Sequence, residues 1–251
     1  MSDQAILEGI VSVQAALESG SRPVHTLYVR RGKQDRALAQ VKRLAREQGV
    51  PIEQVEAEVI DARASGKTHG GVVASVGPRR FVQLDDLLRA SAAPFVVMLD
   101  GIEDPFNFGA AVRALYAAGA DGLVVRPRNW MSAAGIVARS SAGATEWMPT
   151  AVAATVSDAA DVARAHGLTI ACAAKDRAVS IHETDLAFPL FCVVGGEKRG
   201  ITRSFADRAD VRLKIPYGRH FPRSLGTASA VAVLAFEVMR QRTAAQTMED
   251  Q

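Results

Sequence analysis

Apolar and polar residues in the N-terminal part of the chain follow two alternating spacings. Apolar side chains recur at helical spacing from Ile6 to Leu17, which predicts a helix that ends at Gly20. Residues 24–29 alternate and are rich in β-formers, which predicts a strand. Further predicted helices lie at 35–48 and 56–64, and further predicted strands at 51–55 and 72–76. Strands that alternate with helices in this way predict a small α/β domain.

A second alternation follows a segment rich in breaker residues at 91–94. Its strands are short, apolar and bounded by glycines, which is typical of a parallel sheet covered by helices on both faces. Predicted strands lie at 95–99, 122–125, 168–173, 191–194 and 211–215, and predicted helices at 108–118, 131–140, 157–166 and 224–242. We therefore expect one domain at 1–80, a linker at 81–93 and a second α/β domain at 94–251.

Composition narrows the class of protein. The chain has 251 residues, of which 48% are hydrophobic and 23% are charged, as in ordinary globular proteins. Cys172 and Cys192 lie in apolar, strand-like runs, which indicates buried thiols in a reducing compartment. The chain shows neither a signal-peptide pattern nor an apolar run long enough for a membrane span, so we expect a cytoplasmic protein. A net charge of +3 permits a nucleic-acid partner but does not require one.

Several common enzyme motifs are absent from the sequence. Gly66-Lys67-Thr68 is similar to the end of a phosphate-binding loop, but Asp61 stands where that loop needs a glycine. No dinucleotide-binding glycine pattern opens a helix, and no Gly-x-Ser-x-Gly nucleophile turn occurs. The five histidines are scattered, so we expect no metal site.

Three stretches of the second domain form an ordered set. Residues 100–114 read Asp-Gly-Ile-Glu-Asp-Pro-Phe-Asn-Phe-Gly-Ala-Ala-Val-Arg-Ala. Residues 193–201 read Val-Val-Gly-Gly-Glu-Lys-Arg-Gly-Ile. The third comprises Lys-Ile-Pro at 214–216 and Arg-Ser-Leu-Gly-Thr-Ala-Ser-Ala at 223–230. In this order and spacing they resemble the three signature motifs of the SpoU-type (TrmH-type) RNA ribose methyltransferases, and Ser-Ala-Gly-Ala at 141–144 also resembles a family stretch.

The N-terminal domain adds to this resemblance, because Leu-Glu-Gly at 7–9 and Thr-His-Gly-Gly-Val-Val-Ala at 68–74 are similar to the family's substrate-recognition domain. The resemblance implies a ribosomal-protein-like RNA-binding fold for the first domain. It implies a SPOUT fold for the second, with a mostly parallel sheet and a trefoil knot. It further implies methyl transfer from S-adenosylmethionine to a ribose 2′-hydroxyl of structured RNA, ribosomal rather than transfer RNA. Such relatives are homodimers with each cofactor site near the partner.

Glycines and two apolar residues are the predicted cofactor site. Glycine turns after strands let backbone groups approach a ligand closely, a role that suits Gly195, Gly196 and Gly200. The resemblance assigns Ile215 and Leu225 to an apolar grip on the adenine. Taken alone, the glycine-rich stretch is also typical of a plain surface turn.

The resemblance maps Arg113 onto the family's catalytic arginine. Because a guanidinium stays protonated, Arg113 suits a phosphate clamp or a stabiliser of developing negative charge better than a proton acceptor. A solvated helical arginine is the alternative. We expect Glu197 to hold Arg113 through a charge-assisted bond. We expect Asn107 to orient the loop or the ribose, or to cap the following helix.

Basic residues gather in the N-terminal domain between 30 and 46. We expect Arg30, Arg31 and Lys33 to contact RNA phosphates, although an ordinary solvated face has the same composition. His69, in a glycine-flanked loop, is a further RNA-contact candidate or a plain loop residue.

The third motif departs from the family pattern Ser-Leu-Asn-Val-Ser, because Gly226 occupies the Asn position and Ala228 the second Ser position. Two polar side chains near the reaction are therefore missing. This departure leaves open a catalytically inactive RNA-binding protein on the same fold. A small-molecule methyltransferase is a third possibility, which the RNA-binding N-terminal domain disfavours.

Overall fold

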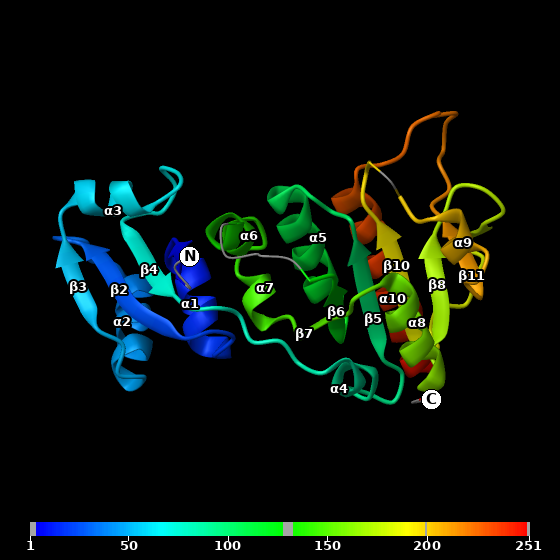
Figure 1. The fold of residues 1–251 in the computed structure, drawn as a ribbon, viewed down its shortest axis with the longest axis horizontal. Coiled ribbons are helices and arrows are strands. Elements are labelled where there is room, and N and C mark those ends of the chain that lie inside the picture. Colours follow the sequence, from blue (N-terminus) through cyan, green and yellow to red (C-terminus); the bar gives the residue numbers. More distant parts are fainter. Residues whose placement is uncertain (1–3, 128–132, 199, 250–251) are drawn as a thin grey trace. The chain divides into compact units, whose positions relative to one another are not determined.

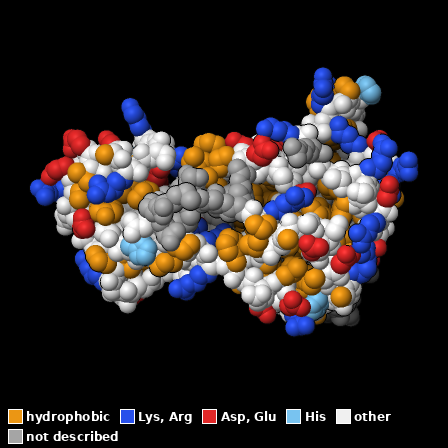
Figure 2. Space-filling view, viewed as in Figure 1, with side chains coloured by type: hydrophobic (Ala, Val, Ile, Leu, Met, Phe, Trp, Pro, Cys, Tyr) orange, Lys and Arg blue, Asp and Glu red, His pale blue; other side chains and the backbone are white. Residues whose placement is uncertain are grey.

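The computed structural model describes residues 4–127, 133–198 and 200–249. The chain divides into two compact units (Figure 1). Unit 1 comprises residues 1–80 with 128–147, and unit 2 comprises 81–127 with 148–251. Lys and Arg side chains are interspersed with Asp and Glu on the visible face of each unit (Figure 2). In this view the small net positive charge is therefore not gathered into one basic face.

Unit 1 is a four-stranded sheet in the order β1-β4-β2-β3, with β2 and β3 parallel and the other pairs antiparallel. The small α/β domain expected from the sequence is thus confirmed. Its elements from the N-terminal part are β1 (Ala5–Glu8), α1 (Ile10–Ser19), β2 (Val24–Arg30), α2 (Arg36–Glu47), β3 (Ile52–Val55), α3 (Ala57–Arg63) and β4 (Val72–Val76).

The first predicted helix begins too early. Ile6 belongs to β1, which pairs antiparallel with β4, and Gly9 with φ of 84° separates this strand from α1. Pairing with the edge of β4 outweighs the helical spacing of Ile6, because it satisfies backbone groups along both strands. The helix does end at Gly20, which adopts the left-handed conformation.

Unit 1 also contains two helices from much later in the sequence, α6 (Ala134–Ser140) and α7 (Ala144–Trp147). The sequence predicts this segment as part of the 94–251 domain. Residues 131 and 132 of the helix predicted at 131–140 lie outside the described residues. Ala134 and Ala138 join the apolar core formed by the N-terminal elements. A Cβ atom on Gly135 would lie 2.6 Å from the carbonyl oxygen of Ile6, so α6 packs directly on the β1 backbone.

Two buried ion pairs reinforce this packing. Arg139 Nη1 lies 2.5 Å from Glu8 Oε2. The guanidinium of Arg22 donates to both carboxylate oxygens of Glu146 at 2.9 Å, and Ser21 Oγ donates to Glu146 Oε2 at 2.5 Å. The carboxylates of Glu8 and Glu146 are almost fully buried, so each depends on its arginine for compensation.

Unit 2 contains a seven-stranded sheet in the order β7-β6-β5-β10-β8-β11-β9, and every paired strand is parallel. The parallel sheet expected from the sequence is confirmed. Its strands are β5 (Phe95–Asp100), β6 (Gly122–Val125), β7 (Thr150–Val152), β8 (Thr169–Ala173), β9 (Val179–Ser180), β10 (Leu190–Gly195) and β11 (Val211–Lys214). Its helices are α4 (Leu84–Leu88), α5 (Pro105–Ala117), α8 (Val156–Ala165), α9 (Arg203–Ala206) and α10 (Thr227–Glu249).

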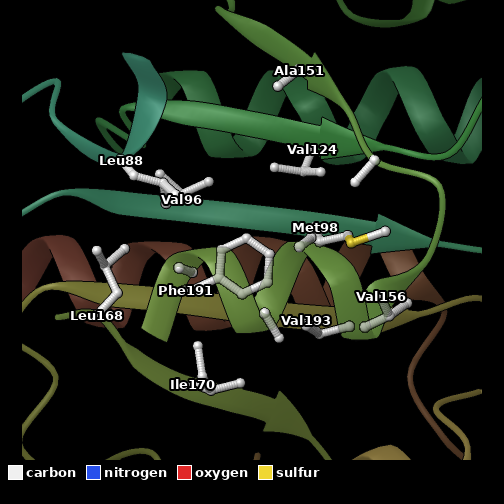
Figure 3. Packing of buried hydrophobic residues seen from close by; sticks show 14 of the residues in the cluster. Leu88, Val96, Met98, Val124, Ala151, Val156, Leu168, Ile170, Phe191 and Val193 are labelled. Carbon is white, nitrogen blue, oxygen red and sulfur yellow. The ribbon is translucent and has the colours of Figure 1, made fainter. Parts of the chain in front are cut away.

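One apolar core lies between the sheet and the helices α4 and α8. Figure 3 shows Val96, Met98, Phe191 and Val193 from adjacent strands, with Val156 of α8 beside them. These side chains are 0–8% exposed, and burial of each large apolar side chain contributes about 1.5–3 kcal/mol. This core fixes the central strands, and with them the loops that follow their carboxyl ends.

Because the strands are parallel, the loops after β5, β8, β10 and β11 lie at one edge of the sheet (Figure 1). The connections reverse direction around β10, which lies between β5 and β8. Ligands of open α/β sheets bind at such a reversal, outside the carboxyl ends of the strands. No described helix is long and apolar enough to cross a bilayer.

Candidate cofactor and catalytic site

A cavity of about 1200 Å³ lies at the carboxyl edge of the unit 2 sheet. Its walls come from the loops after β8, β10 and β11 and from the first turns of α10. All five predicted cofactor residues line it, namely Gly195, Gly196, Gly200, Ile215 and Leu225. The volume slightly exceeds the usual range of ligand pockets, roughly 300–1,000 Å³.

The glycine turn after β10 passes very close to the turn after β5. Gly196 N donates to Asp100 O at 2.7 Å, and a Cβ atom on Gly196 would lie only 2.1 Å from Gly101 O. A Cβ atom on Gly195 would lie 2.5 Å from the carbonyl carbon of Gly200. No side chain fits at either position, so this stretch is a tightly folded wall of the cavity rather than a free surface turn.

Glu197 joins the three motif segments. Its Oε1 accepts a hydrogen bond at 3.2 Å from Asn107 Nδ2 on α5 and another at 3.2 Å from the backbone N–H of Thr227, the first residue of α10. A carboxylate at the N-terminus of a long helix is stabilised by the unpaired N–H groups there. Glu197 therefore ties the glycine turn to both helices that border the site.

Asn107 has a different local role from one that we predicted. Asp104 caps α5, because its Oδ1 accepts from Asn107 N at 2.7 Å, and Pro105 stands at the first helical position. Asn107 therefore lies inside the first turn of α5, and the alternative prediction that it caps this helix is wrong. Its side chain remains available to meet Glu197.

Arg113 lies on α5 with an exposed side chain. The expected Arg113–Glu197 pair does not form, since Glu197 binds Asn107 and Thr227 instead. Within residues 4–127, 133–198 and 200–249, no hydrogen bond or ion pair of Arg113 is found. The guanidinium is therefore available for an anion from outside the chain.

The unusual glycine of the third motif has free space around it. A Cβ atom on Gly226 would lie 3.5 Å from Glu197 Oε1, an ordinary contact distance. The backbone here thus leaves room for the Cβ atom of another residue type. Ala228, half-buried in the first turn of α10, likewise leaves its position without a hydroxyl.

Several charged and aromatic residues of the cavity wall were not among the predicted site residues. They are Lys175, Asp176, Arg177, Arg203, Asp207, Arg212, Tyr217 and Phe221, and Lys214 and Arg223 of the third motif also line the cavity. Arg177, in the loop after β8, has a left-handed backbone with φ of 48°, which is rare for a residue with a side chain. The rule that loops after parallel strands share one edge could have identified this loop.

The two cysteines are not part of this site. Both are buried in unit 2, and burial raises the pKa of each thiol above its ordinary value. A raised pKa keeps a thiol protonated and unreactive, so neither is a candidate nucleophile. Among the described residues, no group of three or more His, Cys, Asp or Glu side chains is placed to hold a metal ion.

Three of the four predicted RNA-contact residues of unit 1, namely Arg30, Lys33 and His69, meet at the loop of Gly71. Arg30 N donates to Gly71 O at 2.9 Å, and a Cβ atom on Gly71 would lie within 3.4 Å of both the Arg30 and Lys33 side chains. Arg31 pairs with Glu56 on the exposed surface. His69 is buried, and its Nδ1 accepts from Gly71 N at 3.1 Å while its Nε2 lies 2.9 Å from Asp61. In this structure the imidazole holds its own loop.

These features define an α/β protein of the parallel-sheet class, with a cavity built from strand-following turns and bordered by the Asn107 amide and the Glu197 carboxylate. The chain belongs to the SpoU rRNA Methylase family, whose model matches residues 94–236. A second family model, described as RNA 2′-O ribose methyltransferase substrate binding, matches residues 6–82.

Curated relatives match the chain along almost its full length. The 23S rRNA (guanosine-2′-O-)-methyltransferase RlmB of Shewanella oneidensis is 29% identical over 245 residues, which cover 96% of this chain and 99% of the relative. The enzyme of the same name from Pseudomonas putida is 30% identical, and the match covers 96% of this chain and 98% of the relative.

Solved structures share the fold. An RNA 2′-O ribose methyltransferase superposes with a TM-score of 0.81 at 23% identity, covering 96% of this chain and 90% of its own. The S-adenosylmethionine-bound rRNA methyltransferase from Sinorhizobium meliloti gives a TM-score of 0.80 at 24% identity. The match covers 95% of this chain and 87% of that structure's chain. At these identities the likeness establishes the fold.

Proposed function

We propose that this protein transfers a methyl group from S-adenosylmethionine to a ribose 2′-hydroxyl of structured RNA, and that the RNA is ribosomal. The observation that carries this proposal is the convergence of all three motif segments on one site, where Glu197 ties the cavity wall to Asn107 and to the start of α10. The names of the relatives that match end to end support ribosomal RNA as the substrate.

The cavity fits the cofactor. The turn at Gly195 and Gly196 packs so closely on neighbouring backbone that its amides and carbonyls, rather than side chains, face a ligand. Ile215 and Leu225 supply apolar wall for the adenine, and Gly200 completes the turn. When bound, S-adenosylmethionine supplies a methyl group activated by a cationic sulfur.

The protein's part in the chemistry is to position the acceptor hydroxyl and stabilise its negative charge. Arg113 supplies a positive charge that stabilises the oxygen as the hydroxyl loses its proton to solvent water, or clamps an adjacent phosphate. Asn107, fixed by Glu197, orients the ribose. Arg113 is not assigned the proton itself.

Unit 1 recognises the RNA in this proposal. Arg30, at the end of β2, and Lys33 lie against the loop of Gly71. Arg31 pairs with Glu56 and Lys33 with Asp35, so RNA phosphates would replace these carboxylates as partners. His69 shapes that loop from inside. Ribosomal RNA as the proposed substrate supports a cytoplasmic location, as in the bacterial relatives.

We further propose that the protein is a homodimer and that unit 2 has the family's trefoil knot. Large apolar side chains are exposed on two helices that pack on each other, α5 and α10. They are Phe106, Tyr116, Val233, Phe236 and Met239, each 36–53% exposed. Apolar side chains gathered on one surface favour burial against a second copy.

The deciding experiment is mass-spectrometric mapping of ribose methylation in ribosomal and transfer RNA from cells with and without the gene. We expect one 2′-O-methyl group of ribosomal RNA to disappear on deletion, to return with the wild-type gene and to stay absent with Arg113→Ala. If every methyl group persists while the purified protein binds RNA, the protein is the inactive RNA-binding form.

The RNA role of unit 1 has its own test in the full chain. The triple substitution of Arg30, Arg31 and Lys33 by Ala should weaken RNA binding and flatten its salt dependence, by roughly 0.7–0.9 in log–log slope per lost phosphate contact. The charge-conserving control Arg30→Lys, Arg31→Lys, Lys33→Arg should retain most of both. Substitution is preferable to truncation, because α6 and α7 would lose their packing partners in unit 1.

A further inference from the structure

The loop between β11 and α10, residues 215–226, extends from the carboxyl edge of unit 2 (Figure 1). Every residue from 216 to 224 is exposed. Hydrophobic, basic and histidine side chains gather at its tip (Figure 2). The loop contains two aromatic residues, Tyr217 and Phe221, and three basic or titratable ones, Arg219, His220 and Arg223.

The two aromatic rings are held near each other in solvent. Tyr217 is 42% exposed and Phe221 is 53% exposed, and their ring centroids lie 6.1 Å apart at an angle of 52°. The hydroxyl of Tyr217 accepts a hydrogen bond of 3.0 Å from Leu225 N, which ties the start of the loop to its end. Both rings also line the cavity. The loop therefore presents two aromatic faces beside the proposed cofactor site.

The charged residues of the loop itself have one sign. Between Asp210 and Glu237 the sequence has four Lys or Arg residues and no Asp or Glu. Within the described part of the chain, neither Arg219 nor Arg223 forms a hydrogen bond or an ion pair. The nearby carboxylates of Asp176, Glu197 and Asp207 belong to other walls of the cavity, so an anion at this loop meets two guanidinium groups that no described side chain pairs.

We infer that the 215–226 loop is a second RNA-binding element, in which Phe221 and Tyr217 stack on an unpaired base while Arg219 and Arg223 hold the flanking phosphates. Exposed aromatics interleaved with arginines are the combination that binds single-stranded RNA, because every base has a π-face and every nucleotide a phosphate. This inference rests on the proposed function, since the methyl acceptor must enter at the edge where the cofactor binds. Unit 1 then supplies affinity for the RNA, and the loop positions the nucleotide for reaction.

The test uses the full-length protein and an RNA hairpin with ten unpaired loop nucleotides, one of them 2-aminopurine. The variants are Phe221→Leu, which keeps an apolar side chain without a π-face, and Phe221→Trp, which restores one. Loss of a stacked base should raise the Kd of Phe221→Leu about 5-fold to 100-fold and abolish the fluorescence quenching that stacking produces. Phe221→Trp should retain both the affinity and the quenching.

The arginines are tested by Arg219→Ala with Arg223→Ala against the matched pair Arg219→Lys with Arg223→Lys. The alanine pair should lower the log–log salt slope by roughly 0.7 for each arginine, and the lysine pair should keep it. Two further measurements on Phe221→Leu check competing roles of the ring. S-adenosylhomocysteine affinity tests a role as a wall of the cofactor site, and sedimentation velocity tests a role in an interface between copies.

Three results would overturn the inference. First, Phe221→Leu could match the wild type in Kd and quenching. Second, it could lose cofactor affinity as strongly as RNA affinity, which would make the ring a wall of the cofactor site. Third, it could change the oligomeric state, which would make the loop an interface between copies. Failure of the proposed function looks different. A wild-type protein that transfers no methyl group but shows Phe221-dependent stacking would refute the reaction and leave the loop's RNA role standing.

Discussion

Asn107 and Glu197 stand 90 positions apart in the sequence, yet the Asn107 amide donates to Glu197 Oε1 at 3.2 Å. The same oxygen accepts from the N–H of Thr227. One carboxylate oxygen therefore holds the first turn of α5, the glycine turn after β10 and the start of α10 in a fixed arrangement. The geometry of the site depends on this junction.

Replacement of Glu197 by Ala removes both hydrogen bonds of the junction. Because the carboxylate is exposed, we expect the smaller end of the usual effect of a charged hydrogen bond, about a tenfold loss of cofactor affinity. Glu197→Gln keeps an acceptor oxygen, so its loss of cofactor affinity, expressed as log Kd, should be less than half that of Glu197→Ala. Isothermal titration with S-adenosylmethionine measures both, and equal losses for the two variants would contradict the junction.

Replacement of Arg113 by Ala should reduce the rate of methyl transfer roughly 100-fold to 1,000-fold, as expected when a charge that stabilises the transition state is lost. Cofactor affinity and thermal stability should hardly change, since the exposed side chain forms no ion pair among the described residues. Single-turnover transfer of labelled methyl groups gives the rate. A wild-type rate would make Arg113 an ordinary solvated residue.

Gly196→Ala should disrupt the cavity wall. The added Cβ would lie 2.1 Å from Gly101 O, so the turn must move, at a cost of roughly 1–3 kcal/mol in stability and with a large loss of cofactor binding. Gly218→Ala is the matched control, because its Cβ would meet nothing within 4 Å. Thermal unfolding and cofactor titration should separate the two variants; similar behaviour would show that the close approach is unimportant.

Glu146→Ala should destabilise unit 1 by about 3–5 kcal/mol, because it leaves the buried guanidinium of Arg22 without its partner. Glu47→Ala, which breaks the exposed pair with Arg43, should cost at most about 0.5 kcal/mol. Urea unfolding measures both changes. A Glu146→Ala variant as stable as Glu47→Ala would mean that α7 adds nothing to unit 1.

Glu237 predicts an acid transition in unit 2. Hydrogen bonding to Arg240 first, and then to Gln241, lowers the pKa of Glu237 to about 2, against an ordinary value of 4.5. A pKa lowered by folding stabilises the native state above the unfolded-state pKa, and that contribution disappears as pH falls from about 4.5 towards 2. Glu237→Gln should therefore lose stability at pH 7 and show a flatter stability profile in this acid range. An unchanged profile would contradict the lowered pKa.

Much of the fold could be predicted because its signals are local. Short apolar runs bounded by glycines indicated the parallel strands of unit 2, and Gly20 ended α1 as expected. Ile6 was misassigned because its spacing suits a helix, while its actual environment is the edge of β4. Periodicity reports which face of a segment is apolar but not which strand will pair with it.

The composition of the cavity wall was also predictable to a useful extent. Gly195, Gly196 and Gly200 line it because turns that follow parallel strands meet at one edge. Ile215 and Leu225, which the family resemblance assigned to the cofactor site, line it as well. The partner of Glu197 was not predictable. Charge complementarity favoured Arg113, and the geometry instead brings an amide and a helix N-terminus to the carboxylate.

The alternation of residue types was sufficient for most helices and strands and for the parallel sheet, because each follows from the chain's immediate neighbours. Strand direction placed the glycine turns at the cavity, and the family resemblance supplied Ile215 and Leu225. Only the tertiary structure revealed that α6 and α7 complete unit 1, that Glu197 meets Asn107, and that Tyr217 and Phe221 remain exposed beside the cavity. Each of these depends on contacts, or on a lack of burial, between segments far apart in sequence. Such contacts are decided by which surfaces fit in three dimensions, and a one-dimensional pattern does not contain that information.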